Sequence, residues 1–158
     1  MSEKMLSYAL PYVAGLIILV WGQAVTYVTL EKLWEKLGIP KGTSRHGQYL
    51  SAVLGAVEGA LYLGAFLYGK PEFIALWLGL KTVVKWRHWE YDVPVGKPTR
   101  WILGRNAYNL FLVGNGLVVC FAAAAWKVAE LLRAEDHPKT YVLLIAIALL
   151  SIALVSLA

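Results

Sequence analysis

Residues 47–89 have the sequence GQYLSAVLGAVEGALYLGAFLYGKPEFIALWLGLKTVVKWRHW, and this stretch decides the fold. Two apolar runs flank the segment YGKP at residues 68–71, whose glycine and proline are typical of a tight turn. Apolar runs of this kind predict two membrane-spanning helices, joined here as an antiparallel pair. Each run contains one ionisable residue, Glu58 before the turn and Lys81 after it.

These two charges are predicted to lie at the same depth in the membrane. Each is about a dozen residues from the turn, which at a rise of about 1.5 Å per residue places both about 16 Å from the same membrane face. An unpaired charge near the bilayer centre costs at least about 2.5–3.5 kcal/mol. Glu58 and Lys81 are therefore predicted to form an ion pair.

The composition indicates an integral membrane protein. Hydrophobic residues make up 59% of the 158-residue chain. The mean hydropathy is +0.58, and the charged residues gather between the long apolar runs. A soluble domain of this length normally has fewer apolar residues and more charge. Residues 1–158 are predicted to form one domain, and the net charge of +5 is attributed to membrane-flanking loops, so no nucleic-acid partner is expected.

Three further apolar runs complete an all-α, polytopic bundle of about five transmembrane helices. They are predicted over residues 7–37, 100–133 and 140–158. The first run is too long for the apolar region of a signal peptide, and Gly38 is expected to end its helix. The third helix of the chain, after Pro71, is short, so the alternative is four spans plus a re-entrant hairpin. The fifth helix contains no charged residue and no evident polar handle, and it is expected to face lipid.

Small and polar residues predict how the helices pack. A small residue recurs at every fourth position of the second helix, a pattern that lets another backbone approach closely. These residues are Gly47, Ser51, Gly55 and Gly59. In an oligomeric transporter the stripe would serve contacts between copies of the chain. Gln23, Thr26 and Thr29 of the first helix are expected to hydrogen-bond either to another helix or to their own helix backbone.

Lys and Arg residues predict the orientation in the membrane. With five spans, one side carries nine of them: Lys32, Lys36, Lys41, Arg45, Lys85, Arg87, Lys97, Arg100 and Arg105. The other side carries Lys4, Lys70, Lys127, Arg133 and Lys139. The excess predicts that the first and third loops are cytoplasmic and the N-terminus is outside. Lipid headgroup contacts are expected at the end of the third helix, from Lys85, Trp86, Arg87 and Trp89.

The polar residues inside the predicted bundle are compatible with three kinds of protein. The set comprises Glu58, Lys81, Arg105, Asn106, Asn109 and Asn115. Intramembrane ionisable residues typically mark ion or proton paths, which favours a homo-oligomeric channel or transporter using Glu58 and Lys81. The alternative is a non-catalytic scaffold or accessory subunit, in which the same residues only fix helix packing. Membrane lipids, a second copy or a membrane partner protein are the expected partners.

An intramembrane enzyme acting on lipid is the least favoured function. His46, His88 and His137 lie apart at loops or helix ends, and Cys120 is the only cysteine. No spacing therefore indicates a metal site, a disulfide or a nucleophile with its base. There is also no phosphate-binding glycine loop and no pair of intramembrane histidines for haem. The protein is predicted not to be an enzyme, with no cofactor, no metal and no catalytic residue.

Overall fold

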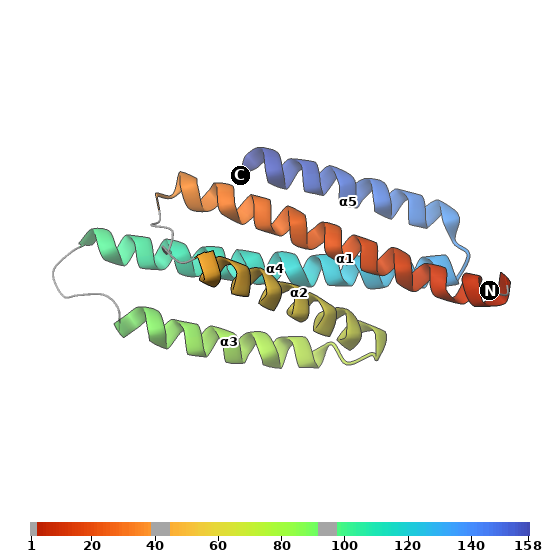
Figure 1. Ribbon diagram of the computed structural model, residues 1–158, viewed down its shortest axis with the longest axis horizontal. Helices are drawn as coiled ribbons and strands as arrows, with labels where there is room; N and C mark the ends of the chain where they lie inside the picture. Colours follow the sequence, from red (N-terminus) through yellow and green to blue (C-terminus); the bar gives the residue numbers. More distant parts are fainter. Residues whose placement is uncertain (1–2, 39–44, 92–97) are drawn as a thin grey trace.

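The computed structural model describes residues 3–38, 45–91 and 98–158, with side chains described for 9–38, 53–84 and 104–158. These residues form five helices, which confirms the predicted all-α bundle. The helices are α1 Glu3–Lys36, α2 Arg45–Leu67, α3 Glu72–Tyr91, α4 Pro98–Arg133 and α5 His137–Leu157. Successive helices run in opposite directions along the long axis of the molecule (Figure 1).

The helix α4 is the centre of the bundle. It contacts all four other helices, whereas α3 contacts only α2 and α4 within the described residues. Figure 1 shows α5 and α3 at opposite edges, with α1, α4 and α2 between them. A residue on α3 therefore meets the bundle through α2 and α4.

Small side chains allow α1 and α4 to lie close together. Ala122 and Ala125 of α4 are fully buried, and the carbonyl oxygen of Ala125 lies 3.1 Å from where a Cβ on Gly15 would sit. A Cβ on Gly22 would collide with the ring of Phe121. Because these two glycines have no side chain, α4 packs closely against α1, as is expected of membrane helices.

The turn between α2 and α3 follows the predicted segment. Gly69 has a φ of +65°, a conformation that glycine adopts without steric cost. The amide of Lys70 donates to the carbonyl of Ala65 at 2.8 Å, and the amide of Gly69 donates to Phe66 at 3.1 Å. This pair of bonds is the Schellman arrangement that closes a helix end. It brings α3 back alongside α2 and so places Lys81 opposite Glu58.

Among the described residues, three helices are long and apolar enough to cross a membrane, and a fourth segment is apolar but shorter. The spans are Ala9–Lys36, Gly104–Arg133 and His137–Leu157, and the shorter segment is Val53–Leu67. Many large apolar side chains on these segments are exposed, among them Ile17, Leu61 and Leu149. Apolar exposure on this scale is expected of a surface covered by lipid. The fold is that of an integral membrane helical bundle.

The fifth helix is held to the bundle by polar contacts that the sequence did not predict. Ser151 is buried, and its hydroxyl accepts a 3.2 Å hydrogen bond from the indole of Trp21 on α1. The Lys32 and Lys36 ammonium groups donate to the carbonyls of Val155 and Leu157, at 2.7 and 3.1 Å. These carbonyls lie in the last turn of α5, where cations are favourable. The expectation that α5 lacks a polar handle is wrong, although most of its surface is exposed.

The loop before α5 also fixes the start of that helix. Asp136 is its N-cap residue and accepts from the backbone amide of Lys139 at 3.3 Å. Its other oxygen lies 2.7 Å from the Lys139 ammonium. These hydrogen bonds from Lys139 lower the pKa of the Asp136 carboxyl below its ordinary value.

The glycine stripe on α2 packs within the chain. The side chain of Gln23 on α1 lies against Gly55 and Gly59 and donates to the carbonyl of Gly55 at 3.0 Å. A Cβ on Gly59 would lie 2.5 Å from the Gln23 amide nitrogen and 3.2 Å from Leu19. These two glycines accommodate α1 of the same chain. Gly47 and Ser51 lie outside the residues whose side chains are described.

The polar residues of α1 behave differently from one another. Gln23 makes the predicted interhelical hydrogen bond. The hydroxyls of Thr26 and Thr29 are buried and have no hydrogen-bond partner among the described residues, so the expectation was wrong for both. The prediction assumed that each side chain faces a free acceptor.

Candidate functional site: a buried ion pair between α2, α3 and α4

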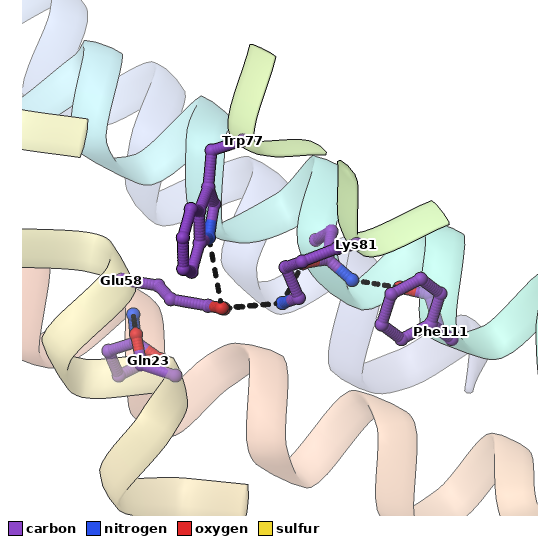
Figure 2. Close-up of polar contacts among 7 residues, drawn as sticks. Gln23, Glu58, Trp77, Lys81 and Phe111 are labelled. Carbon is purple, nitrogen blue, oxygen red and sulfur yellow. Dashed lines mark hydrogen bonds and ion pairs between the residues drawn. The ribbon is translucent and has the colours of Figure 1, made fainter. Parts of the chain in front are cut away.

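The candidate site lies where α2, α3 and α4 meet. Glu58 comes from α2, Trp77 and Lys81 from α3, and Phe111 and Asn115 from α4. Figure 2 shows the indole of Trp77 and the side chain of Lys81 directed at the Glu58 carboxylate, with the Phe111 ring beyond them. The site therefore links all three helices through side chains.

Glu58 and Lys81 form the ion pair that their matched depths predict. The Lys81 Nζ lies 2.6 Å from Glu58 Oε1 and 2.7 Å from Oε2. Removing two charges from water costs free energy, and only close geometry with further hydrogen bonds compensates for it. Both carboxylate oxygens face the ammonium here, which is the close geometry that such a pair requires.

Asn115 completes the coordination of the ammonium. Its Oδ1 accepts from Lys81 Nζ at 2.7 Å, and its Nδ2 donates to the backbone carbonyl of Phe111 at 2.6 Å. The bond to this carbonyl orients the amide, because a carbonyl oxygen accepts only from the NH₂ end. The Phe111 ring centroid lies 5.2 Å from Nζ, within the range of a cation–π contact.

Trp77 is one of the site residues that the sequence interpretation missed. Its indole Nε1 donates to Glu58 Oε1 at 3.3 Å. It precedes Lys81 by four residues, so both side chains lie on one face of α3. The four-residue spacing could have indicated that Trp77 lies beside Lys81 in the site. A buried indole N–H also needs a hydrogen-bond acceptor, and the Glu58 carboxylate is one.

Tyr62 adds a polar group one helical turn after Glu58. It is fully buried, and its hydroxyl has no hydrogen-bond partner among the described residues. The i, i+4 spacing places Tyr62 and Glu58 on the same face of α2.

The pair is more accessible from α3 than from α2. The Glu58 side chain is 5% exposed and the Lys81 side chain is 17% exposed. Figure 1 shows α3 at the edge of the bundle. The Lys81 side chain is the more exposed member of the pair, and the Glu58 side chain is the more shielded one. Access to Glu58 thus depends on where Lys81 and α3 lie.

The other predicted pathway residues lie nearer the start of α4. Arg105 and Asn109 are exposed, and Asn106 is half-buried. Arg105 precedes Asn115 by ten residues, which is about 15 Å along the helix axis. Their role as the mouth of a path stays a prediction. The predicted headgroup residues lie outside the described side chains: Lys85, Trp86, Arg87 and Trp89.

No group of three or more His, Cys, Asp or Glu side chains that could hold a metal ion occurs in the described part of the chain. Cys120 is exposed. A cavity of about 240 Å³ lies elsewhere, between α1, α4 and α5, and its lining is mainly aliphatic. The chemistry of the chain therefore centres on the ion pair and not on this cavity.

Comparison with protein-family models, curated proteins and solved structures finds no match to this chain, so its function is argued from the site.

Proposed function

We propose that the protein moves a proton or another small cation across the membrane, with Glu58 as the carboxylate that takes up and releases it. The observation that carries the proposal is the buried Glu58–Lys81 pair within an apolar bundle. Ionisable residues are costly at this depth, and in membrane proteins they commonly serve ion or proton paths. Lys81 acts in this proposal as an internal cation that occupies Glu58 between transport events.

The position of the site supports a path along α3. Only α2 and α4 hold α3 within the described residues, and the Lys81 side chain is the more exposed member of the pair. A path needs walls on every side, and α3 lies at the edge of the bundle. The proposal therefore includes a second copy of the chain or a membrane partner beside α3.

The proposed orientation places the first and third loops in the cytoplasm. It is supported by the excess of Lys and Arg residues on that side of the predicted bundle. In this orientation Arg105 lies toward the cytoplasmic end of α4. The proposed path then runs from Glu58 toward that end.

Proton movement in proteoliposomes tests the proposal. The purified protein is reconstituted with a pH-sensitive dye inside, and a pH gradient is imposed. Wild-type protein is expected to dissipate the gradient faster than empty liposomes, and Glu58→Gln is expected to abolish the difference. Glu130→Gln is the matched control, because Glu130 forms an exposed ion pair with Lys127 on α4.

The double variant Glu58→Leu with Lys81→Leu separates function from folding. It removes both charges and leaves no unpaired one, so it is expected to fold while losing flux. A double variant that dissipates the gradient as fast as wild type would refute the proposal.

A scaffold or accessory subunit is the second candidate, and one observation favours it. Both Glu58 oxygens, the Lys81 ammonium and both ends of the Asn115 amide have partners at short distances. A fully satisfied network can fix helix register without any transport role. This candidate predicts equal leak from wild-type protein and Glu58→Gln.

A further inference from the structure

We propose that the groups around the Lys81 ammonium form a binding site for a free protonated primary amine, which exchanges with Lys81 on Glu58. The inference rests on the proposed function and names the class of cation. The Lys81 side chain ends in a primary alkylammonium, so the groups around Nζ are a shell that already accommodates this functional group.

Oxygen acceptors from two side chains surround the Lys81 ammonium. An alkylammonium group has three N–H donors and no acceptor. Three oxygens lie within 2.7 Å of Nζ: Glu58 Oε1, Glu58 Oε2 and Asn115 Oδ1. Two of them carry the compensating negative charge. A free primary ammonium placed at Nζ meets the same three oxygens.

The orientation of the shell does not depend on Lys81. The Asn115 amide is held by the backbone carbonyl of Phe111, and one Glu58 oxygen is held by the indole of Trp77. Both contacts remain when the lysine stem is removed. The acceptors are therefore already oriented for an incoming ligand, which lowers the entropic cost of ordering them on binding.

The shell fits an organic ammonium better than a metal cation. Calcium takes six to eight oxygen ligands and magnesium requires near-octahedral coordination, whereas a carboxylate and one amide supply three oxygens here. The ring centroid of Phe111 lies 5.2 Å from Nζ. An aromatic face attracts ammonium groups and offers no oxygen to a metal ion.

Lys81 itself is the competitor of such a ligand. A tethered group acts at an effective concentration on the order of millimolar, so a free amine must exceed this level to displace Lys81 from Glu58. Removing the lysine side chain removes the competitor. The variant Lys81→Ala lacks three methylenes and the ammonium, and these atoms together correspond to n-propylammonium.

Chemical rescue of Lys81→Ala by n-propylammonium tests the inference. Thermal unfolding of the purified variant is followed in lipid nanodiscs as n-propylammonium chloride is added, with sodium chloride and tetramethylammonium chloride at equal ionic strength. A saturable rise in melting temperature at millimolar n-propylammonium, absent with the other two salts, is expected. Tetramethylammonium is the informative comparison, because it can contact the Phe111 ring but donates no hydrogen bond.

The double variant Glu58→Gln with Lys81→Ala is the matched control and is expected not to respond, since the negative charge is gone. Equal responses to all three salts, or no response to any, would overturn the inference. Glu58-dependent proton flux in wild-type protein combined with an unresponsive Lys81→Ala overturns the amine site alone. A specific response without any cation movement supports the amine site and overturns the proposed function.

A second measurement uses the wild-type chain, in case Lys81→Ala does not fold. The probe is 1,3-diaminopropane, which is doubly protonated at neutral pH and crosses bare lipid slowly. Uptake into proteoliposomes that Glu58→Gln abolishes supports the inference. In a preparation that shows Glu58-dependent proton flux, uptake no faster than into empty liposomes overturns it.

Discussion

Glu58 and Lys81 stabilise the chain only as a pair. Glu58→Leu leaves the Lys81 ammonium with Asn115 as its remaining oxygen partner, and losing one member of a buried pair costs about 3–5 kcal/mol. The double variant Glu58→Leu with Lys81→Leu is expected to recover most of this loss, because no charge is left unpaired. Reversible unfolding in detergent measures the free energy of unfolding of each variant.

The same double-mutant cycle at Lys127 and Glu130 provides the control. This pair is exposed and its atoms lie 2.7 Å apart, so its coupling is expected to be below about 1 kcal/mol. A double variant of Glu58 and Lys81 that is no more stable than the worse single variant would show that the two residues are not coupled.

The sequence identified the ion pair but not the groups that surround it. Counting residues from one turn was sufficient to match the depths of Glu58 and Lys81, because both belong to one hairpin. Asn115 and Phe111 belong to α4, and no local rule states which face of α4 meets that hairpin. Asn115 was recognised as polar and buried, but its contact with Lys81 required the packing of α3 against α4.

At the scale of the element, substitution by alanine at two glycines of α2 is expected to change stability in opposite directions. Gly59→Ala places a Cβ 2.5 Å from the Gln23 amide nitrogen and 3.2 Å from Leu19, so the Gln23 amide must move away and lose its hydrogen bond to Gly55. The loss of this bond is expected to cost about 0.5–1.5 kcal/mol. Gly64→Ala places its Cβ in open space, and the better helix propensity of alanine is expected to stabilise by up to about 1 kcal/mol. Unfolding midpoints of the two variants check the prediction.

Equal effects of the two substitutions would mean that α2 does not lie against α1 as described. Both substitutions add one methyl group to the same helix, so a difference between them reports the surroundings of each glycine. It also bears on oligomerisation, since a variant that weakens the α1–α2 contact is expected to lower stability at every protein concentration.

The helices themselves were largely predictable, and their partners were not. The turn at Gly69 and the end of α1 at Gly38 follow from backbone chemistry that acts over a few residues. The helix that packs against Gly55 and Gly59 could not be predicted in this way, because a small-residue stripe indicates close approach but not which helix approaches. Gln23 of α1 lies against these glycines in the structure.

At the scale of the whole molecule, the exposed apolar surface distinguishes a lipid environment from water. Leu149 on α5 is 62% exposed and lies near the middle of that helix. In lipid, Leu149→Lys is expected to cost about 2.5–3.5 kcal/mol and to reduce the membrane-inserted fraction. Tyr141→Lys, near the start of α5, is the control, because a lysine there can extend to the headgroups. Alkaline extraction of membranes measures the inserted fraction of both variants, and identical fractions would contradict a lipid-facing α5.

The class of the molecule was therefore predictable from composition, while its internal order was not. The lengths of the apolar runs and the positions of the charged residues depend on whether lipid or water surrounds the chain, so the sequence indicates the surrounding solvent directly. The central position of α4 depends on which small faces fit together, as Gly22 and Phe121 do. Contacts of this kind join residues about a hundred positions apart, beyond the range of any sequence period.

The attachment of α3 through its own site residues has a thermodynamic consequence. Lys81 and Trp77 bind Glu58 and also join α3 to α2. In the proposed exchange, a cation that replaces Lys81 therefore weakens that attachment. Linkage makes the effect reciprocal: whatever fastens α3 to the bundle must lower cation affinity by the same factor. A ligand or partner that binds across α2 and α3 would thus act as an inhibitor without touching Glu58, and one that draws α3 away would act as an activator.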